Sequence, residues 1–210
     1  MDIKIVSDAK GNFLNFNIKE QPEHPLGSPL IISLGRTYLK GETVSVIVYY
    51  KTIPNQSSGA LQWLTPDQTL GKQYPFVYTQ CEAIQCRTLL PCQDSPGAKV
   101  YVTARLTVPK PLTALLAGVQ SAEPQVNGDS QTFTYRSPNP IPSYLIAFAA
   151  GALEYRSLGK RTGVFAEKEI VEKAQYEFED TEQYVSTVYL FNYRLKPILI
   201  NLTLGKYITF

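Results

Sequence analysis

The residues of this sequence that could carry chemistry gather in one short stretch, residues 78–96. Gln80 and Glu82 are separated there by a single residue, and Arg87 follows soon after them. Side chains two positions apart point to the same face of an extended segment, so this spacing predicts that Gln80 and Glu82 lie side by side. A carboxylate beside a carboxamide can accept charge-assisted hydrogen bonds from an ammonium group. The pair is therefore a candidate receptor for the amino group of a ligand.

Glu82 has a second interpretation, which is purely structural. Arg87 lies close enough in the sequence to form an ion pair with Glu82, and such a pair would only stabilise the fold. The residue types alone do not decide between a ligand amine and Arg87 as the partner of Glu82. Both alternatives stay open at this point.

Three cysteines, Cys81, Cys86 and Cys92, lie in the same stretch. A structural zinc site needs four ligands and usually has pairs of cysteines two residues apart, whereas these spacings are wider. The single histidine, His24, belongs to a distant proline-rich segment, which also argues against a Cys/His or Ser/His catalytic dyad. We therefore predict buried free thiols, with no metal and no cofactor in this chain.

Composition and charge exclude several classes of protein. A 210-residue chain with 44% hydrophobic residues can form a substantial core, which argues against disorder. The net charge of +2 is spread along the chain without a basic block, so we predict no nucleic-acid partner. The charged start, Met1 to Lys4, does not resemble a secretory signal, and no apolar run reaches the length of a membrane span. These features predict a cytoplasmic protein without membrane contact.

Strand patterns surround the central stretch and predict a mainly β fold. Residues 2–50 are interpreted as a β meander with a tight turn at Gly11, and residues 98–109 alternate as a half-buried strand does. Asn127-Gly128 predicts a hairpin, and the almost wholly apolar run 144–153 predicts a strand covered on both faces.

Two segments near the centre lack a clear pattern. Residues 51–74 are expected to be irregular around an apolar island at 60–64. Residues 112–119 are compatible with either a helix or an extended segment, because their propensity is helical but their length is short.

Helical periodicity occurs only near the end of the chain. Residues 167–178 place apolar side chains on one face, and Asp180 or Thr181 could cap a second helix whose acidic residues, Glu182 included, are interpreted as a solvated face. We divide the chain into three parts. They are a β-sheet amino-terminal domain, 1–166, a helical link, 167–186, and an atypical apolar and basic tail, 187–210.

Four motifs in order resemble those of one enzyme family, the zinc aminopeptidases of the gluzincin type. They resemble in particular the branch that contains leukotriene-A(4) hydrolase and aminopeptidase B, from about residue 1 to about residue 184. The matching motifs are Thr79-Gln80-Cys81-Glu82-Ala83 with Pro91-Cys92-Gln93-Asp94-Ser95-Pro96, Ala60-Leu61-Gln62-Trp63-Leu64-Thr65-Pro66, Ser143-Tyr144-Leu145-Ile146-Ala147 with Gly151-Ala152-Leu153-Glu154, and Glu167-Lys168-Glu169.

The resemblance implies an amino-terminal domain shaped as a saddle of mixed β-sheets, which covers a zinc-bearing catalytic domain. It also implies that Gln80 and Glu82 bind the free amino end of a peptide substrate and that Ala83 forms part of the first side-chain pocket. Glu82 resembles the residue of ordinary aminopeptidases more than that of the epoxide hydrolase, which carries glutamine there. Peptidase-like specificity is expected, with epoxide hydrolysis as the other activity of the full-length family.

The sequence departs from that family in its catalytic motifs. The family holds zinc with H-E-x-x-H and also carries G-x-M-E-N, whereas this chain has one histidine and its only methionine is Met1. We therefore expect a chain truncated at both ends, inactive alone, whose partner is the missing catalytic domain and whose zinc belongs to the full-length enzyme. The alternatives are a non-catalytic β interaction module and a truncated gene product without function.

Overall fold

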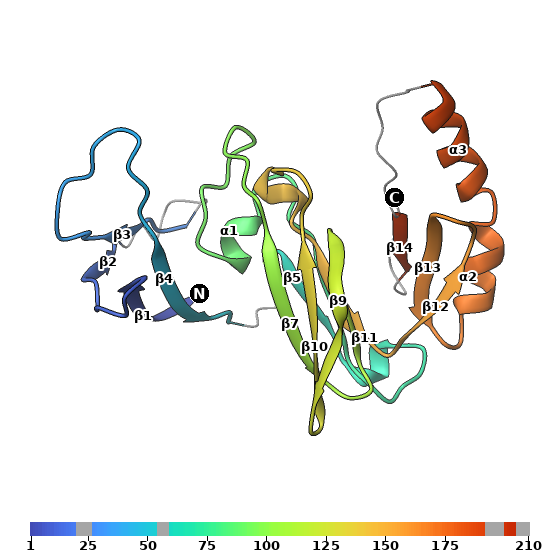
Figure 1. The fold of residues 1–210 in the computed structure, drawn as a ribbon. Coiled ribbons are helices and arrows are strands. Elements are labelled where there is room, and N and C mark those ends of the chain that lie inside the picture. Colours follow the sequence, from blue (N-terminus) through green and yellow to red (C-terminus); the bar gives the residue numbers. More distant parts are fainter. Residues whose placement is uncertain (20–26, 54–58, 192–199, 205–210) are drawn as a thin grey trace.

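The computed structural model describes residues 1–19, 27–53, 59–191 and 200–204 (Figure 1). The predicted mainly β class with short helices near the carboxyl end is confirmed. The strands are β1 Asp2–Asp8, β2 Phe16–Ile18, β3 Leu30–Ile32, β4 Val46–Lys51, β5 Leu61–Leu64, β6 Phe76–Thr79, β7 Thr103–Pro109, β8 Thr113–Leu116, β9 Val119–Asn127, β10 Ser130–Arg136, β11 Phe148–Gly151, β12 Leu153–Ser157, β13 Thr162–Glu167 and β14 Ile200–Leu204. The helices are α1 Cys86–Leu89, α2 Val171–Glu177 and α3 Thr181–Phe191, with 3₁₀ turns at Pro66–Gln68 and Ser143–Leu145.

Two packed sheets form the centre of the molecule. A four-stranded sheet has the order β5-β6-β11-β8, and a three-stranded sheet has the order β7-β10-β9. Alternation along β10 turns Phe133 and Tyr135 inward, where they pack with Val77, Ala114 and Ala150 of the other sheet. The Tyr135 hydroxyl donates a 2.9 Å hydrogen bond to the carbonyl oxygen of Ala114, so its buried polar atom is satisfied.

The amino-terminal strands do not form the predicted meander. β1 pairs with β4 in antiparallel fashion, and β2 pairs with β3. The turn at Gly11 does form, with φ of +87°, but in the described part of the chain it is flanked by a single isolated bridge, between Ser7 and Phe13. Pairing with β4 places Val48 opposite Val6, which is 1% exposed. Burying Val6 against this distant strand therefore stabilises β1 more than a local hairpin at Gly11 would.

Two central segments differ from the sequence pattern. Residues 61–64, expected to be an apolar island in an irregular region, form β5 and pair with β6. Residues 113–116, left open between helix and strand, are extended as β8 because Ala114 is fully buried in the sheet core.

The Asn127-Gly128 hairpin is confirmed, since it joins β9 and β10. The predicted strand at 144–153 is shorter than expected, with β11 beginning at Phe148.

A three-stranded sheet, β12-β13-β14, ends the described chain. β14 runs parallel to β13, so the sheet is mixed. Helix α2 packs on β13 through Val164, Ala166, Val171 and Ala174. This helix begins later than the predicted residue 167 because Glu167 is the last residue of β13.

Helix α3 confirms the second predicted helix but corrects the interpretation of its acidic face. The side chain of Glu182 is 21% exposed and accepts hydrogen bonds from the Arg161 guanidinium at 3.1 Å and the Thr162 hydroxyl at 2.8 Å. Glu182 therefore anchors the first turn of α3 to the start of β13 and is not part of a solvated face. These contacts lower its pKa, with the Thr162 bond as the largest cause.

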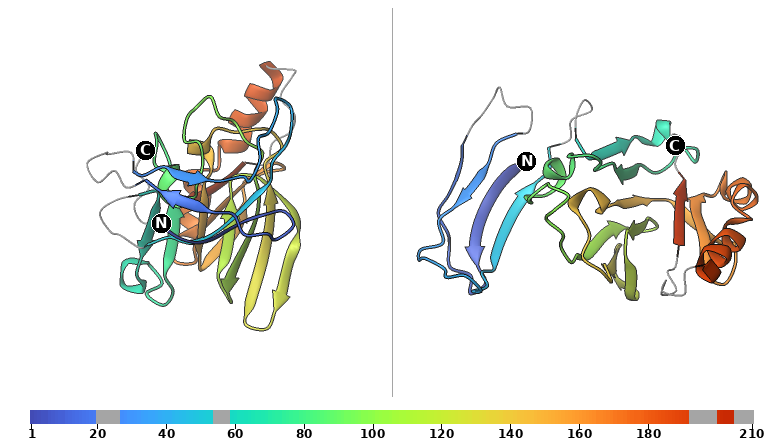
Figure 2. Two further views of the ribbon diagram at one scale, coloured as in Figure 1. Left: turned by 90° about the vertical axis from the view of Figure 1, so that its left-hand side faces the viewer. Right: turned by 90° about the horizontal axis from the view of Figure 1, so that it is seen from above.

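The whole arrangement is elongated. In Figure 2, seen from above, β1 to β4 and the carboxyl-terminal helices lie at opposite ends, with the central sheets between them. Within the predicted tail, the structure describes the end of α3 and β14, whereas residues 192–199 and 205–210 lie outside the described residues. The division of the chain into three parts stays a prediction.

Candidate functional site

The predicted site residues follow directly after β6, a central strand that pairs with both β5 and β11. The amide of Gln80 donates a 2.7 Å hydrogen bond to the carbonyl oxygen of Ala60, beside the start of β5. The hydroxyl of Thr79 accepts a 2.9 Å bond from the amide of Phe148 on β11. The point where the chain leaves the sheet is therefore fixed from both neighbouring strands.

Beyond Gln80 the chain turns, which corrects one step of the sequence argument. The strand pairing of β6 ends at Tyr78 on the β11 side and at Thr79 on the β5 side. The amide of Gln85 then donates a 2.8 Å bond to the carbonyl oxygen of Cys81. Glu82 and Ala83 lie inside this turn, joined by a cis peptide bond. The expectation of a continuous extended segment through Glu82 is wrong, so the alternation of a strand does not align Gln80 with Glu82. Gln80, Glu82 and Ala83 are nevertheless all exposed on one short loop.

The alternative partner proposed for Glu82 is also wrong. Arg87 pairs with Asp94, with 3.0 Å between Nε and a carboxylate oxygen, and its backbone amide donates to the same oxygen at 3.1 Å. The other oxygen of Asp94 accepts a 2.6 Å bond from the hydroxyl of Ser143. Among the described residues, no hydrogen bond or ion pair engages the side chain of Glu82.

Asp94 was not singled out by sequence reasoning, although it lies in the same stretch. Its side chain is 2% exposed and joins α1 to the 3₁₀ turn at Ser143. Burial raises the pKa of Asp94, but the hydrogen bonds from Ser143 and Arg87 together hold this pKa below its usual value. The ionised carboxylate of Asp94 therefore holds α1 against the turn at Ser143, and α1 directly follows the loop that carries Gln80 and Glu82.

Thr88 is a second anchor that the sequence did not indicate. Its hydroxyl accepts a 2.7 Å hydrogen bond from the amide of Ala60 and donates a 2.7 Å bond to the carbonyl oxygen of Gln85. These bonds tie α1 to the start of β5. The loop is therefore held at both of its ends, while its side chains face solvent.

The cysteines are free, as predicted, but only two are buried. Cys81 and Cys86 belong to the core, whereas Cys92 is exposed. Within the ranges that the structure describes, no group of three or more histidine, cysteine, aspartate or glutamate side chains could hold a metal ion. His24 lies outside the described residues.

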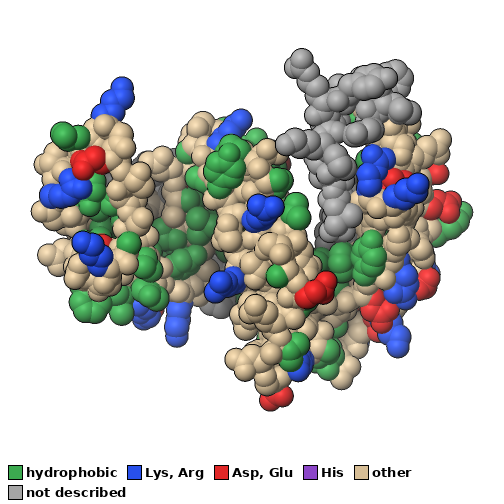
Figure 3. Space-filling view, viewed as in Figure 1, with side chains coloured by type: hydrophobic (Ala, Val, Ile, Leu, Met, Phe, Trp, Pro, Cys, Tyr) green, Lys and Arg blue, Asp and Glu red, His purple; other side chains and the backbone are tan. Residues whose placement is uncertain are grey.

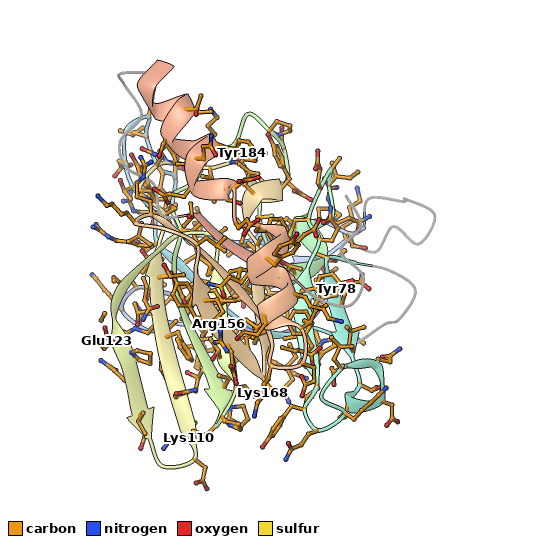
Figure 4. The ribbon with its side chains drawn as sticks, turned by 90° about the vertical axis from the view of Figure 1, so that its right-hand side faces the viewer. Tyr78, Lys110, Glu123, Arg156, Lys168 and Tyr184 are labelled. Carbon is orange, nitrogen blue, oxygen red and sulfur yellow. The ribbon has the colours of Figure 1, made fainter. Side chains whose placement is uncertain are left out.

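A separate cavity of about 300 Å³ lies between the loop at 71–74 and the strands β12 and β13. Glu167 closes one side of it, with a carboxylate that accepts a 2.9 Å hydrogen bond from the amide of Leu70. Lys168, labelled in Figure 4, also lines it. Gln80, Glu82 and Ala83 do not line this cavity, so the structure separates it from the predicted site.

On the face drawn in Figure 3, acidic and basic side chains are interspersed. In the described part of the chain, no helix combines the length and the apolar character that crossing a membrane requires.

Comparison with known proteins gives a consistent result. A family model described as "Peptidase M1 N-terminal domain" matches residues 1–145. Leukotriene A-4 hydrolase of Xenopus laevis is 42% identical over 159 residues, which are 75% of this chain and 26% of that protein. Leucine aminopeptidase 2 of Yarrowia lipolytica is 36% identical over 187 residues, 89% of this chain and 27% of that protein. The chain thus spans about a quarter of the length of these relatives.

Solved structures agree with the sequence matches. The structure of native yeast LTA4 hydrolase superposes with a TM-score of 0.82 at 29% identity, covering 97% of this chain and 30% of that one. An M1 zinc metallopeptidase from Deinococcus radiodurans has a TM-score of 0.59 at 20% identity, which indicates a shared fold alone.

Proposed function

Because the chain belongs to the M1 peptidase N-terminal domain family, we propose that it supplies the surface that holds the free amino end of a peptide in a larger aminopeptidase. The observation that carries this proposal is the exposed carboxylate of Glu82, which has no partner among the described residues and lies on a loop whose two ends are anchored. A carboxylate in this state can accept hydrogen bonds from a peptide ammonium without first breaking an ion pair. Gln80, which is exposed on the same loop, supplies a neutral acceptor.

Hydrolysis belongs, in this proposal, to the remainder of a longer protein. The relative from Deinococcus radiodurans is a zinc metallopeptidase, but the residues of this chain do not fit a zinc centre of the H-E-x-x-H type. The whole sequence has one histidine, and the described residues contain no group that could hold a metal. We propose that the chain alone binds amino ends and does not cleave peptides, and that removal of amino-terminal residues needs the catalytic domain.

A binding experiment tests this role. Short peptides with a free amino end are expected to bind weakly and to shift the backbone amide signals of residues 80–85 in an NMR titration. Replacing Glu82 with alanine should weaken this binding by roughly 10-fold to 100-fold, since a hydrogen bond to a charged group contributes about 1.5–3 kcal/mol. The same peptides with acetylated amino ends should bind no better to the natural chain than to the Glu82→Ala variant.

The matched control is Glu123→Ala, because Glu123 is an exposed glutamate on β9, far along the chain from the loop. It should leave the titration unchanged. Equal shifts with free and acetylated peptides, or shifts confined to the β9–β10 hairpin, would rule out an amino-end receptor at Glu82.

A second candidate is a non-catalytic interaction module, and one observation favours it. Ile5 of β1 and Tyr49 of β4 are cross-strand partners that are 42% and 55% exposed, with Ile47 exposed on the same face. An exposed apolar face of this kind is typical of a surface that another protein covers. Light scattering at increasing concentration distinguishes the candidates, because self-association abolished by Tyr49→Ser would favour the module.

A further inference from the structure

The cavity between the loop at 71–74 and the strands β12 and β13 is lined by apolar and charged side chains together. Its volume of about 300 Å³ is at the small end of the range for ligand pockets. Pro111 and Leu153 supply apolar surface, and the charged residues that line the cavity are Glu154, Glu167, Lys168 and Glu169. The proposed peptide site uses none of these residues, so the function of this cavity is a separate question.

The loop beside the cavity is held in place by hydrogen bonds. The hydroxyl of Thr69, a residue that is 1% exposed, donates to the carbonyl oxygens of Pro66 at 2.8 Å and Tyr74 at 3.1 Å. The carboxylate of Glu167, at the end of β13, accepts hydrogen bonds from the amides of Leu70 at 2.9 Å and Gly71 at 3.4 Å. Because these bonds fix the loop and join it to β13, little ordering is needed when a ligand binds.

Two carboxylates meet at Gly71. That of Glu167 lies on the amide of Gly71, and a Cβ atom added to Gly71 would lie 3.3 and 3.5 Å from the two carboxylate oxygens of Glu169. The absence of a side chain at position 71 therefore leaves the space that the second carboxylate occupies. Glycine is not required here by its backbone, since Gly71 is not among the glycines with positive φ.

The negative charge of this cavity is not balanced among the described residues. Glu154 forms an ion pair with Arg156 at 3.1 Å. Glu167, which is 7% exposed, is bonded only to backbone amides, and Glu169 has no hydrogen bond or ion pair. Lys168 is exposed and pairs with neither of them. Two carboxylates against one ammonium group leave an excess of negative charge, which attracts a cation more strongly where burial lowers the local dielectric constant.

We propose that this cavity binds a guanidinium group carried on a short alkyl chain. A guanidinium is planar and has five N–H donors, so it can donate to two carboxylates at once. The carboxylate of Glu167 still has acceptor positions, because two amides fill only two of about four. The alkyl chain would cover the apolar surface of Pro111 and Leu153. A metal ion fits less well, since the described residues contain no group of three side chains that could hold one.

A titration of the folded 210-residue chain with n-butylguanidinium tests this site. The NMR signals of the amides of Leu70 and Gly71 should shift and saturate, because the ligand approaches the carboxylate to which these amides donate. n-Butylurea has the same shape without the charge and should give no saturable shift. The probe has no amino end, so its binding does not depend on the proposed function of Glu82.

A second arm distinguishes two sources of the same chemical group. The probe is arginine amide with an acetylated amino end, in which the guanidinium is part of a peptide. Affinity close to that of n-butylguanidinium would indicate an arginine side chain of a polypeptide as the natural ligand. Binding that is tenfold weaker or more would indicate a free small molecule, because the peptide groups then do not fit at the mouth of the cavity.

Two variants place the ligand in this cavity. Glu169→Gln removes the charge of an exposed residue and should weaken n-butylguanidinium binding roughly tenfold or more, since a hydrogen bond to a charged group is lost. Gly71→Ala should weaken it as well, because the added methyl group displaces the carboxylate of Glu169. The matched control is Glu177→Gln at the end of α2, an exposed glutamate that does not line the cavity and should leave the affinity unchanged.

Glu82→Ala separates this inference from the proposed peptide site. It should abolish discrimination between free and acetylated amino ends and leave the n-butylguanidinium titration unchanged. Circular dichroism checks that each variant is folded, and the comparison with n-butylurea needs no variant. Equal shifts with n-butylurea, an unchanged affinity in a folded Glu169→Gln chain, or shifts confined to residues 80–85 would overturn the proposal.

Discussion

Replacing Asp94 with alanine is expected to lower the free energy of unfolding by about 3 kcal/mol, because it removes one partner of a mostly buried charge pair. The Asp94 side chain is 2% exposed and that of Arg87 is 28% exposed, so the guanidinium would lose its carboxylate partner where water reaches it only in part. Ser143, itself 2% exposed, would also lose the acceptor of its hydroxyl. The loss should loosen the loop that carries Gln80 and Glu82, since α1 follows that loop directly.

Urea unfolding followed by circular dichroism measures this effect as a lower midpoint. The matched control is Glu42→Ala, which breaks an exposed ion pair with Arg36 whose side chains are 36% and 56% exposed. Such surface pairs contribute about 0–1 kcal/mol, so the control should move the midpoint little. Equal losses in the two variants would show that Asp94 has no special role.

The same carboxylate should make stability depend on pH in a defined direction. The pKa of Asp94 is lowered in the folded chain, because the bonds from Ser143 and Arg87 outweigh the opposing effect of burial. Its contribution is therefore present above the unfolded value of about 3.9 and is lost as the pH falls through the lower folded value. Thermal unfolding between about pH 6 and pH 2 should reveal a decline below about pH 4 that is shallower in Asp94→Asn. An unchanged slope in that variant would contradict this assignment.

Replacing Phe133 with alanine should be still more destabilising, with a loss of about 3–5 kcal/mol. Phe133 is 6% exposed and lies between the two central sheets, where it contacts the cluster of Val77, Ala114 and Ala150. Strands on both sides limit how far this core can collapse, so a cavity would remain.

The control for Phe133 is Val126→Ala on the neighbouring strand β9, because Val126 is 61% exposed. It removes apolar atoms from the same sheet without opening a cavity and should cost less than about 0.5 kcal/mol. Urea midpoints of the two variants measure the difference. Similar midpoints would mean that the two sheets do not share a tightly packed core.

Local patterns predicted a large part of this fold because they depend on neighbouring residues. The hairpin at Asn127-Gly128 and the second helix from Thr181 formed as expected. The concentration of polar residues and cysteines in 78–96 also identified the loop that the structure presents between two anchored ends. Family membership followed from short motifs in order, which are themselves local.

Contacts between residues far apart in the sequence decided the strand pairing and the place where β6 ends. The hairpin pattern at Gly11 was correct as a turn, yet β1 pairs with β4, because burial of Val6 depends on a strand some forty positions away. Alternation could not reveal that β6 ends at Thr79, since a strand ends where its partners β5 and β11 end.

By itself, the sequence determined the β class, the family and the segment that holds Gln80, Glu82 and the cysteines. Only the tertiary structure decided which groups are partners there. In the structure Arg87 pairs with Asp94, Glu82 is exposed, and Cys81 and Cys86 are buried whereas Cys92 is not. The reason is physical: charge pairing and burial depend on distances across the folded chain, and residue spacing along the chain does not fix those distances.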